Sequence, residues 1–260
     1  MKKIPLRINF GRTVLFGDSI QENTNPRWLF LHGAGTSDRK RFEQLRILLA
    51  DVGVGSCSFD FIGHGETGGS LIGSSLESRA AQTAALIDSH AVSRPLSIVA
   101  SSMGGHIAIK MTESHEIENL VLIAPAVYAS QAHSIPFGPI FTEVIRRHFS
   151  WRETDDWEIL RNYKGNLLIF EAENDQIVPH EVIERIYDSA RDARSRALVV
   201  VEGATHSLAK WLDERQDSLR GIVEMIHGLH QSTDKAHGGT IRVESEGQGK
   251  GSTFVVEFPA

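Results

Sequence analysis

Short apolar runs alternate with longer segments of helical periodicity through most of the chain. An unbroken apolar run is typical of a strand buried on both faces, whereas apolar positions three or four apart indicate an amphipathic helix. Strands are predicted at Trp28–Leu31, Ser56–Phe61, Leu96–Ala100, Leu120–Ala124, Leu167–Phe170 and Ala197–Val201. Helices are predicted at Asp38–Asp51, Leu76–His90, from His106 onward, Glu181–Arg191 and Lys210–His230. This order predicts an α/β fold with a mostly parallel, twisted sheet and helices on both faces.

Three segments depart from this alternation. Leu6–Phe16 alternates apolar and polar residues around Gly11, which indicates an antiparallel hairpin. Tyr128–Lys164 has no clear period and is predicted to be a small, irregular insert. Near the C-terminus, Thr240–Ser245 and Thr253–Phe258 alternate around a glycine-rich turn, which predicts a second hairpin.

Composition narrows the class of partner. The net charge of −6 leaves no basic surplus to meet phosphates, so we expect no nucleic acid and favour a small molecule. The single cysteine, Cys57, excludes an internal disulfide and every multi-cysteine metal motif. The two lysines near the N-terminus precede no apolar run, and no later stretch is long enough for a membrane span. We therefore expect a cytoplasmic protein.

The stretch Leu96–Ile107, LSIVASSMGGHI, has the form of a nucleophile elbow. A buried strand turns abruptly into a helix, and Ser102 lies at the bend. Ala100 and Gly104 flank it at the two positions where a tight reversal needs small side chains. We predict that Ser102 is a catalytic nucleophile.

A serine nucleophile needs a base and an acid, and ligand sites in open α/β sheets lie beyond the carboxyl ends of the strands. His206 follows the strand Ala197–Val201, and Asp175 follows the strand before it. We predict that His206 takes the serine proton and that Asp175 orients the imidazole. Two alternatives stay open for the acid: Glu171 and Glu173 are close to Asp175 in the chain, and Asp175 could instead cap the next helix.

The tetrahedral intermediate of acyl transfer needs backbone donors for its oxyanion. One N–H is expected from Met103, directly after the nucleophile. The second is expected from Ala34, in the loop His32–Gly35 that follows the first buried strand.

Five motifs in this order resemble the α/β-hydrolase superfamily, over about residues 5–232: LFLHGAG, SFDFIGHGETGG, IVASSMGG, LLIFEAENDQIVP and VEGATHSL. The resemblance implies a hydrolase domain over residues 1–232 with a cap insert at 128–164, and a triad of Ser102, Asp175 and His206. It also implies that Asp60–Gly65 is a structural loop.

These residues predict a serine hydrolase that cleaves a carboxylic ester or related acyl substrate through an acyl-enzyme. Two alternatives stay open: another α/β-hydrolase chemistry, such as carbon–carbon bond hydrolysis or cofactor-free peroxidation, and a non-catalytic ligand-binding relative. His32, Phe137, Phe141 and Trp151 are candidates for the substrate pocket, although the aromatic residues could equally anchor a short helix.

No cofactor or metal is expected. Gly63–Gly68 matches G-x-G-x-x-G, but the loop continues to Ser75 before a helix begins, which argues against a dinucleotide site. His227, His230 and His237 lack carboxylate or cysteine neighbours that would complete a metal site.

Residues 233–260 form a separate tail. The sequence AHGGTIRVESEGQGKGSTFVVEFPA resembles the C-terminal end of a histidine-kinase ATPase domain, without the upstream elements of its ATP site. The predicted hairpin could dock on the hydrolase body, pair with another chain or stay mobile, and the oligomeric state is left open.

Overall fold

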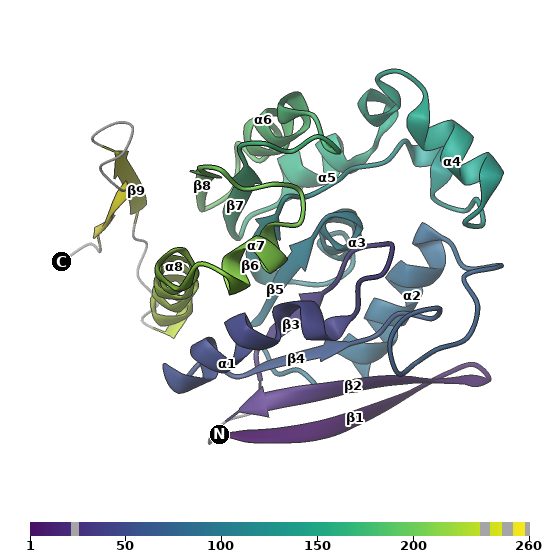
Figure 1. Ribbon diagram of the computed structural model, residues 1–260, viewed down its shortest axis with the longest axis horizontal. Coiled ribbons are helices and arrows are strands. Elements are labelled where there is room, and N and C mark those ends of the chain that lie inside the picture. The colour runs from purple at the N-terminus through teal and green to yellow at the C-terminus, as the bar shows by residue number, and fades with distance from the viewer. Residues whose placement is uncertain (22–25, 235–239, 246–251, 258–260) are drawn as a thin grey trace.

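The computed structural model describes residues 1–21, 26–234, 240–245 and 252–257. Its main feature is an eight-stranded sheet in the order β1-β2-β4-β3-β5-β6-β7-β8 (Figure 1). The strands are β1 (Lys2–Phe10), β2 (Thr13–Gln21), β3 (Trp28–Leu31), β4 (Ser56–Phe59), β5 (Leu96–Ser101), β6 (Ile117–Ile123), β7 (Asn166–Ala172) and β8 (Ser195–Val201).

The sheet is antiparallel only at its N-terminal edge. β1 pairs with β2, and β2 with β4, in antiparallel register, whereas every pair from β4 to β8 is parallel. All residues of β3, β4 and β7 are buried, which explains the apolar runs of β3 and of Leu167–Phe170 in β7. In β4 the buried hydroxyl of Ser58 donates to the carbonyl oxygen of Phe30. The predicted fold class is confirmed, and the predicted N-terminal hairpin extends further in both directions than its alternating pattern.

Helices cover both faces of the sheet and bury two separate apolar clusters. One face carries α1 (Glu43–Asp51) and α8 (Gln216–Asp234), and the other carries α2 (Leu76–Asp88), α3 (Met103–Met111) and α6 (His180–Ser189) (Figure 1). The short helix α7 (Leu208–Asp213) precedes α8, so the single helix predicted from Lys210 is two helices.

The insert between β6 and β7 is more regular than its sequence pattern predicts. It contains the helices α4 (Pro139–Arg146) and α5 (Asp156–Asn162), with the 3-10 turns η2 (Ser130–Ala132) and η3 (Ser150–Glu153). Another 3-10 turn, η1 (Arg39–Phe42), leads into α1.

The C-terminal strands β9 (Thr240–Ser245) and β10 (Ser252–Glu257) pair antiparallel in a sheet of their own, as the alternating pattern predicts. Within the described ranges, no helix combines the length and apolar character needed to cross a bilayer.

Candidate active site

Ser102 lies at a sharp reversal between β5 and α3. Its φ of 51° and ψ of −123° are unusual for a residue with a side chain, and such a conformation costs about 1–3 kcal/mol. Gly104 allows the bend, because a Cβ there would lie 2.6 Å from the carbonyl oxygen of Leu31. The surrounding fold therefore holds the serine in a strained, half-buried position at the end of a buried strand.

A chain of hydrogen bonds runs from Ser102 through His206 to Asp175. The Oγ of Ser102 is 2.9 Å from Nε2 of His206, and Nδ1 of His206 is 2.8 Å from Oδ2 of Asp175. The three side chains come from the ends of β5, β8 and β7, which the parallel sheet brings to one edge. The structure thus places His206 between Ser102 and Asp175, in contact with both.

The carboxylate of Asp175 is held by its own loop. Its Oδ1 accepts hydrogen bonds from the backbone N–H groups of Ile177 and Val178, at 2.8 and 3.0 Å. Burial opposes ionisation, but the hydrogen bonds from His206 and these two N–H groups outweigh it and lower the pKa of Asp175. The carboxylate is therefore ionised and oriented toward the imidazole at neutral pH.

The neighbouring acids are engaged elsewhere. Glu171 contacts the imidazole of His180, and Glu173 accepts a hydrogen bond from the backbone N–H of Gly203 at 2.8 Å. The latter bond ties the acid loop to the loop that carries His206. No side chain caps the N-terminus of α6, so the helix-capping alternative for Asp175 has no counterpart in the structure.

The two expected oxyanion donors lie beside the nucleophile. Met103 is the first residue of α3, and the first N–H groups of a helix have no acceptor within it. Gly33 and Ala34 line the same pocket as Ser102. A Cβ on Gly33 would lie 3.1 Å from the Cβ of Ser102, so the loop approaches the nucleophile closely.

The buried side chain of Arg79, on α2, supports the loop that carries Ala34. Its guanidinium donates to the carbonyl oxygen of Gly33 at 3.3 Å and to Nε2 of His64 at 2.6 Å. His64 in turn donates from Nδ1 to the carbonyl oxygen of Ser37 at 2.8 Å. Burial lowers the pKa of Arg79 to about 10, so the side chain is still charged at neutral pH.

His32 is fully buried, and both of its ring nitrogens have protein partners. Nδ1 lies 2.8 Å from the carbonyl oxygen of Gly33, and Nε2 accepts from the N–H of Phe61 at 3.2 Å. Burial, with the positive charge of Arg79, lowers the pKa of His32 well below its ordinary value. His32 is thus neutral and bound on both sides by the protein, which leaves no ring nitrogen for a substrate.

The aromatic residues expected at the substrate pocket lie in the insert. Phe141 is buried against Tyr128 and Phe137, and Trp151 packs against Trp157. None of them lines the small pocket at Ser102, so the structure gives them a packing role within the insert.

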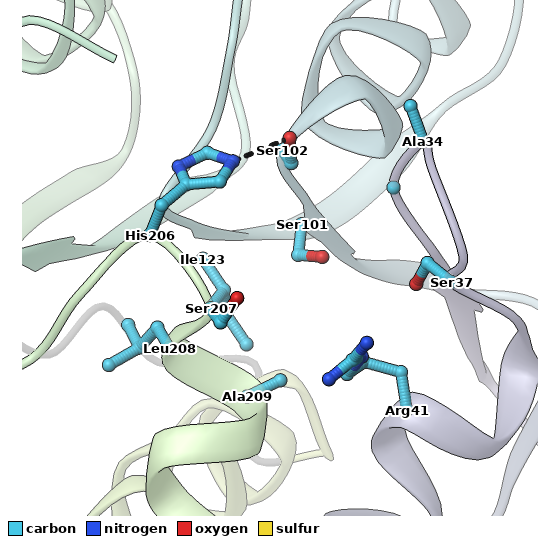
Figure 2. A pocket seen from close by; sticks show the side chains of 11 residues that line it. Ala34, Ser37, Arg41, Ser101, Ser102, Ile123, His206, Ser207, Leu208 and Ala209 are labelled. Atoms are coloured by element: carbon cyan, nitrogen blue, oxygen red, sulfur yellow. Dashed lines mark hydrogen bonds between the residues drawn. The ribbon is translucent and has the colours of Figure 1, made fainter. Parts of the chain in front are cut away.

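A pocket of about 90 Å³ opens beside Ser102 and His206 (Figure 2). Among the lining side chains that the sequence pattern did not single out is Arg41 of η1, whose guanidinium reaches toward the space beside Ser101 and Ser207. No spacing signal marks Arg41, because it lies in a helical segment far from the strand ends.

Among the described residues, no three histidine, cysteine or acidic side chains cluster as metal ligands. Gly63–Gly68 forms a closed turn, with the N–H of Gly63 bonded to the carbonyl oxygen of Gly68 at 2.6 Å. No helix begins until Leu76, so these glycines do not open onto a helix as a dinucleotide site requires.

Sequence comparison matches residues 24–164 of the 260 to the family described as serine aminopeptidase, S33. This match ends before the tail, whose resemblance to a histidine-kinase ATPase domain is not borne out. No curated protein gives a significant sequence match.

Several solved structures share the fold. An esterase from Exiguobacterium antarcticum superposes with a TM-score of 0.66 at 19% identity, over 85% of this chain and 98% of that one. A monoacylglycerol lipase from Paleococcus ferrophilus gives 0.64 at 19% identity, over 83% and 99%. A thioesterase domain from the curacin biosynthetic pathway gives 0.66 at 15% identity, over 87% and 99%. At these identities the likeness establishes the fold.

Proposed function

Since the chain belongs to the serine aminopeptidase S33 family of α/β-hydrolases, and so is a hydrolase, we propose that it cleaves a carboxylic ester or related acyl substrate. In this proposal Ser102 is the nucleophile, His206 the general base and acid, and Asp175 the residue that orients the histidine. The backbone N–H groups of Ala34 and Met103 bind the oxyanion.

The reaction follows from the positions of the protons. Nδ1 of His206 donates to Asp175, so Nε2 carries a lone pair directed at the hydroxyl of Ser102. As Oγ attacks the carbonyl carbon, its proton passes to Nε2 and the carbonyl electrons move onto the oxygen. The imidazolium then protonates the leaving alcohol, thiol or amine as the acyl-enzyme forms. Water, activated by the same nitrogen, completes hydrolysis.

The observation that carries this proposal is the continuous hydrogen-bond chain from Oγ of Ser102 to the carboxylate of Asp175. Serine is a poor nucleophile at neutral pH, and a base at 2.9 Å is the activation that acyl transfer needs. The structural neighbours include an esterase, a lipase and a thioesterase, which agrees with acyl transfer.

The experiment combines a fluorophosphonate probe with p-nitrophenyl esters of increasing chain length. We expect the probe to label the wild-type protein, and Ser102→Ala to abolish labelling and lower ester hydrolysis about a millionfold. Ser114→Ala is the matched control, because Ser114 is exposed, lies beyond the end of α3 and does not line the pocket at Ser102. Folded wild-type protein that neither reacts with the probe nor turns over any ester would contradict the proposal.

A further inference from the structure

The pocket beside Ser102 has a polar lining that the proposed reaction does not use. Besides the nucleophile, base and oxyanion loop, it is lined by Arg41 and by the hydroxyls of Ser37, Ser101 and Ser207. Among the residues that the structure describes, these three hydroxyls form no hydrogen bond. Ile123, Leu208 and Ala209 complete the wall, so the only formal charge of the lining is that of Arg41.

Arg41 differs from the arginines around it in having no ion-pair partner. Arg39 pairs with Asp18 and Asp60, and Arg46 pairs with Asp18. Within the described ranges, no carboxylate lies within 4.0 Å of the guanidinium of Arg41. It therefore has its full hydrogen-bonding capacity available for a ligand.

The charge of Arg41 acts on the carboxyl group of Asp213, at the end of α7. Burial raises the pKa of Asp213, and the charge of Arg41 only partly offsets this effect. The influence is electrostatic without an ion pair, so Asp213 does not occupy the donors of the guanidinium.

The segment that carries Arg41 is firmly held. Asp38 caps η1 by accepting a hydrogen bond from the N–H of Lys40 at 2.9 Å. The neighbouring Arg39 is locked to the buried Asp60 through both its backbone N–H and its guanidinium. The backbone of Arg41 is thus fixed relative to the sheet, which gives its side chain a defined approach to the pocket.

We propose that this pocket binds a carboxylate carried by the substrate, with Arg41 as its counter-ion and the adjacent hydroxyls as further donors. A volume of about 90 Å³ has room for a group of a few heavy atoms. The planar guanidinium fork also matches a carboxylate. This inference rests on the proposed function, because it names the substrate class of that site: short acyl esters with a free carboxylate, such as monoesters of dicarboxylic acids.

The cationic side chains of the insert are less suited to this role. Arg152 pairs with Glu181 and lies over the ring of Phe149, and Arg147 pairs with Glu143. None of them lines the pocket at the nucleophile.

The test compares p-nitrophenyl monoesters of succinate, glutarate and adipate with the same esters whose free carboxyl is methylated. For the chain length that fits best, we expect the wild-type kcat/KM to favour the carboxylate ester. Arg41→Gln should lower this preference about ten- to a hundredfold, because a charge-assisted hydrogen bond is lost. Lys40→Gln, which removes an exposed charge from the same turn, should keep the wild-type preference.

A wild-type protein that hydrolyses the methylated esters at least as well as the carboxylates, or a preference unchanged by Arg41→Gln, would overturn the carboxylate pocket while leaving the proposed function intact. If no ester of either kind is hydrolysed, the proposed function fails. Titration calorimetry with glutarate then tests the carboxylate pocket by itself. Glutarate binding that is lost in Arg41→Gln supports the pocket, and equal binding by the wild-type protein and Arg41→Gln overturns it.

Discussion

Two histidine–aspartate pairs among the described residues have similar short contacts in very different surroundings. Nδ1 of His206 lies 2.8 Å from Asp175, and Nδ1 of His106 lies 2.6 Å from Asp156. The side chain of His206 is 21% exposed and its Nε2 faces Ser102, whereas His106 is 1% exposed and its Nε2 has no hydrogen-bond partner among the described atoms. A short histidine–carboxylate hydrogen bond is therefore not enough to identify a general base. The histidine must also lie beside a nucleophile and be accessible to substrate.

The second pair serves the packing of the insert. His106 lies one turn after the nucleophile on α3, and Asp156 is the first residue of α5. The ring of His106 also packs edge-on against Tyr128 at 5.4 Å. The buried pair therefore fastens the insert to the helix that follows Ser102.

Replacing each carboxylate by its amide is the sharpest way to separate the two pairs. Asp175→Asn should lower kcat about 10⁴-fold, because the amide no longer holds the imidazole in the right tautomer. Asp156→Asn should lower kcat less than tenfold, since His106 takes no part in proton transfer. Steady-state kinetics on a p-nitrophenyl ester measure both variants. Similar losses of kcat in the two variants would contradict the different roles assigned to the two pairs.

The free energy of unfolding should depend strongly on the buried pair of His106 and Asp156, although kcat should not. Asp156→Ala leaves His106 without its buried partner, and breaking a buried pair typically costs about 3–5 kcal/mol. The matched control is Asp155→Ala, which removes a half-exposed carboxylate and leaves Lys110 with Asp156 and Glu113, so it should cost less. Urea unfolding gives both free energies. An equal cost for the two variants would mean that the buried pair contributes no more than a surface one.

The smallest effect concerns a buried histidine that has no acid beside it. The pKa of His32 is lowered on folding, so below about pH 6.5 the unfolded chain binds more protons and the folded state loses stability. This loss is at most about 1.4 kcal/mol per pH unit and ends once the pH passes below the folded pKa. Urea unfolding from pH 7.5 to 5 should show it, with a shallower slope in His32→Gln. Identical slopes would assign the acid sensitivity to other groups.

Much of the fold was predictable because strands buried on both faces leave unbroken apolar runs. The division of the last helix was not, since the residues between α7 and α8 include no glycine or proline to mark a break. The helix α5 was missed because it spans only Asp156–Asn162, too short to set a period.

Some residues of the candidate site could likewise be predicted from the sequence, and others could not. Ser102, Asp175 and His206 could be chosen from sequence because the carboxyl ends of parallel strands meet at one edge. Arg79 and Arg41 could not, since their side chains reach the site from helical segments through contacts that no local spacing encodes. His32 was expected in the substrate pocket by its place in the loop, and only the direction of its ring reveals its bonds to Gly33 and Phe61.

Ser102 and His206 are 104 residues apart in the chain and meet only when β5 and β8 belong to the same sheet. Contacts so distant in sequence form late in folding, because loop-closure entropy is lost before they can stabilise the chain. A folding intermediate with the elbow formed but β8 undocked would hold a serine without its base. During refolding, fluorophosphonate reactivity should therefore recover at the same rate as the sheet is completed. The reactivity of Ser102 then reports how fast the fold assembles.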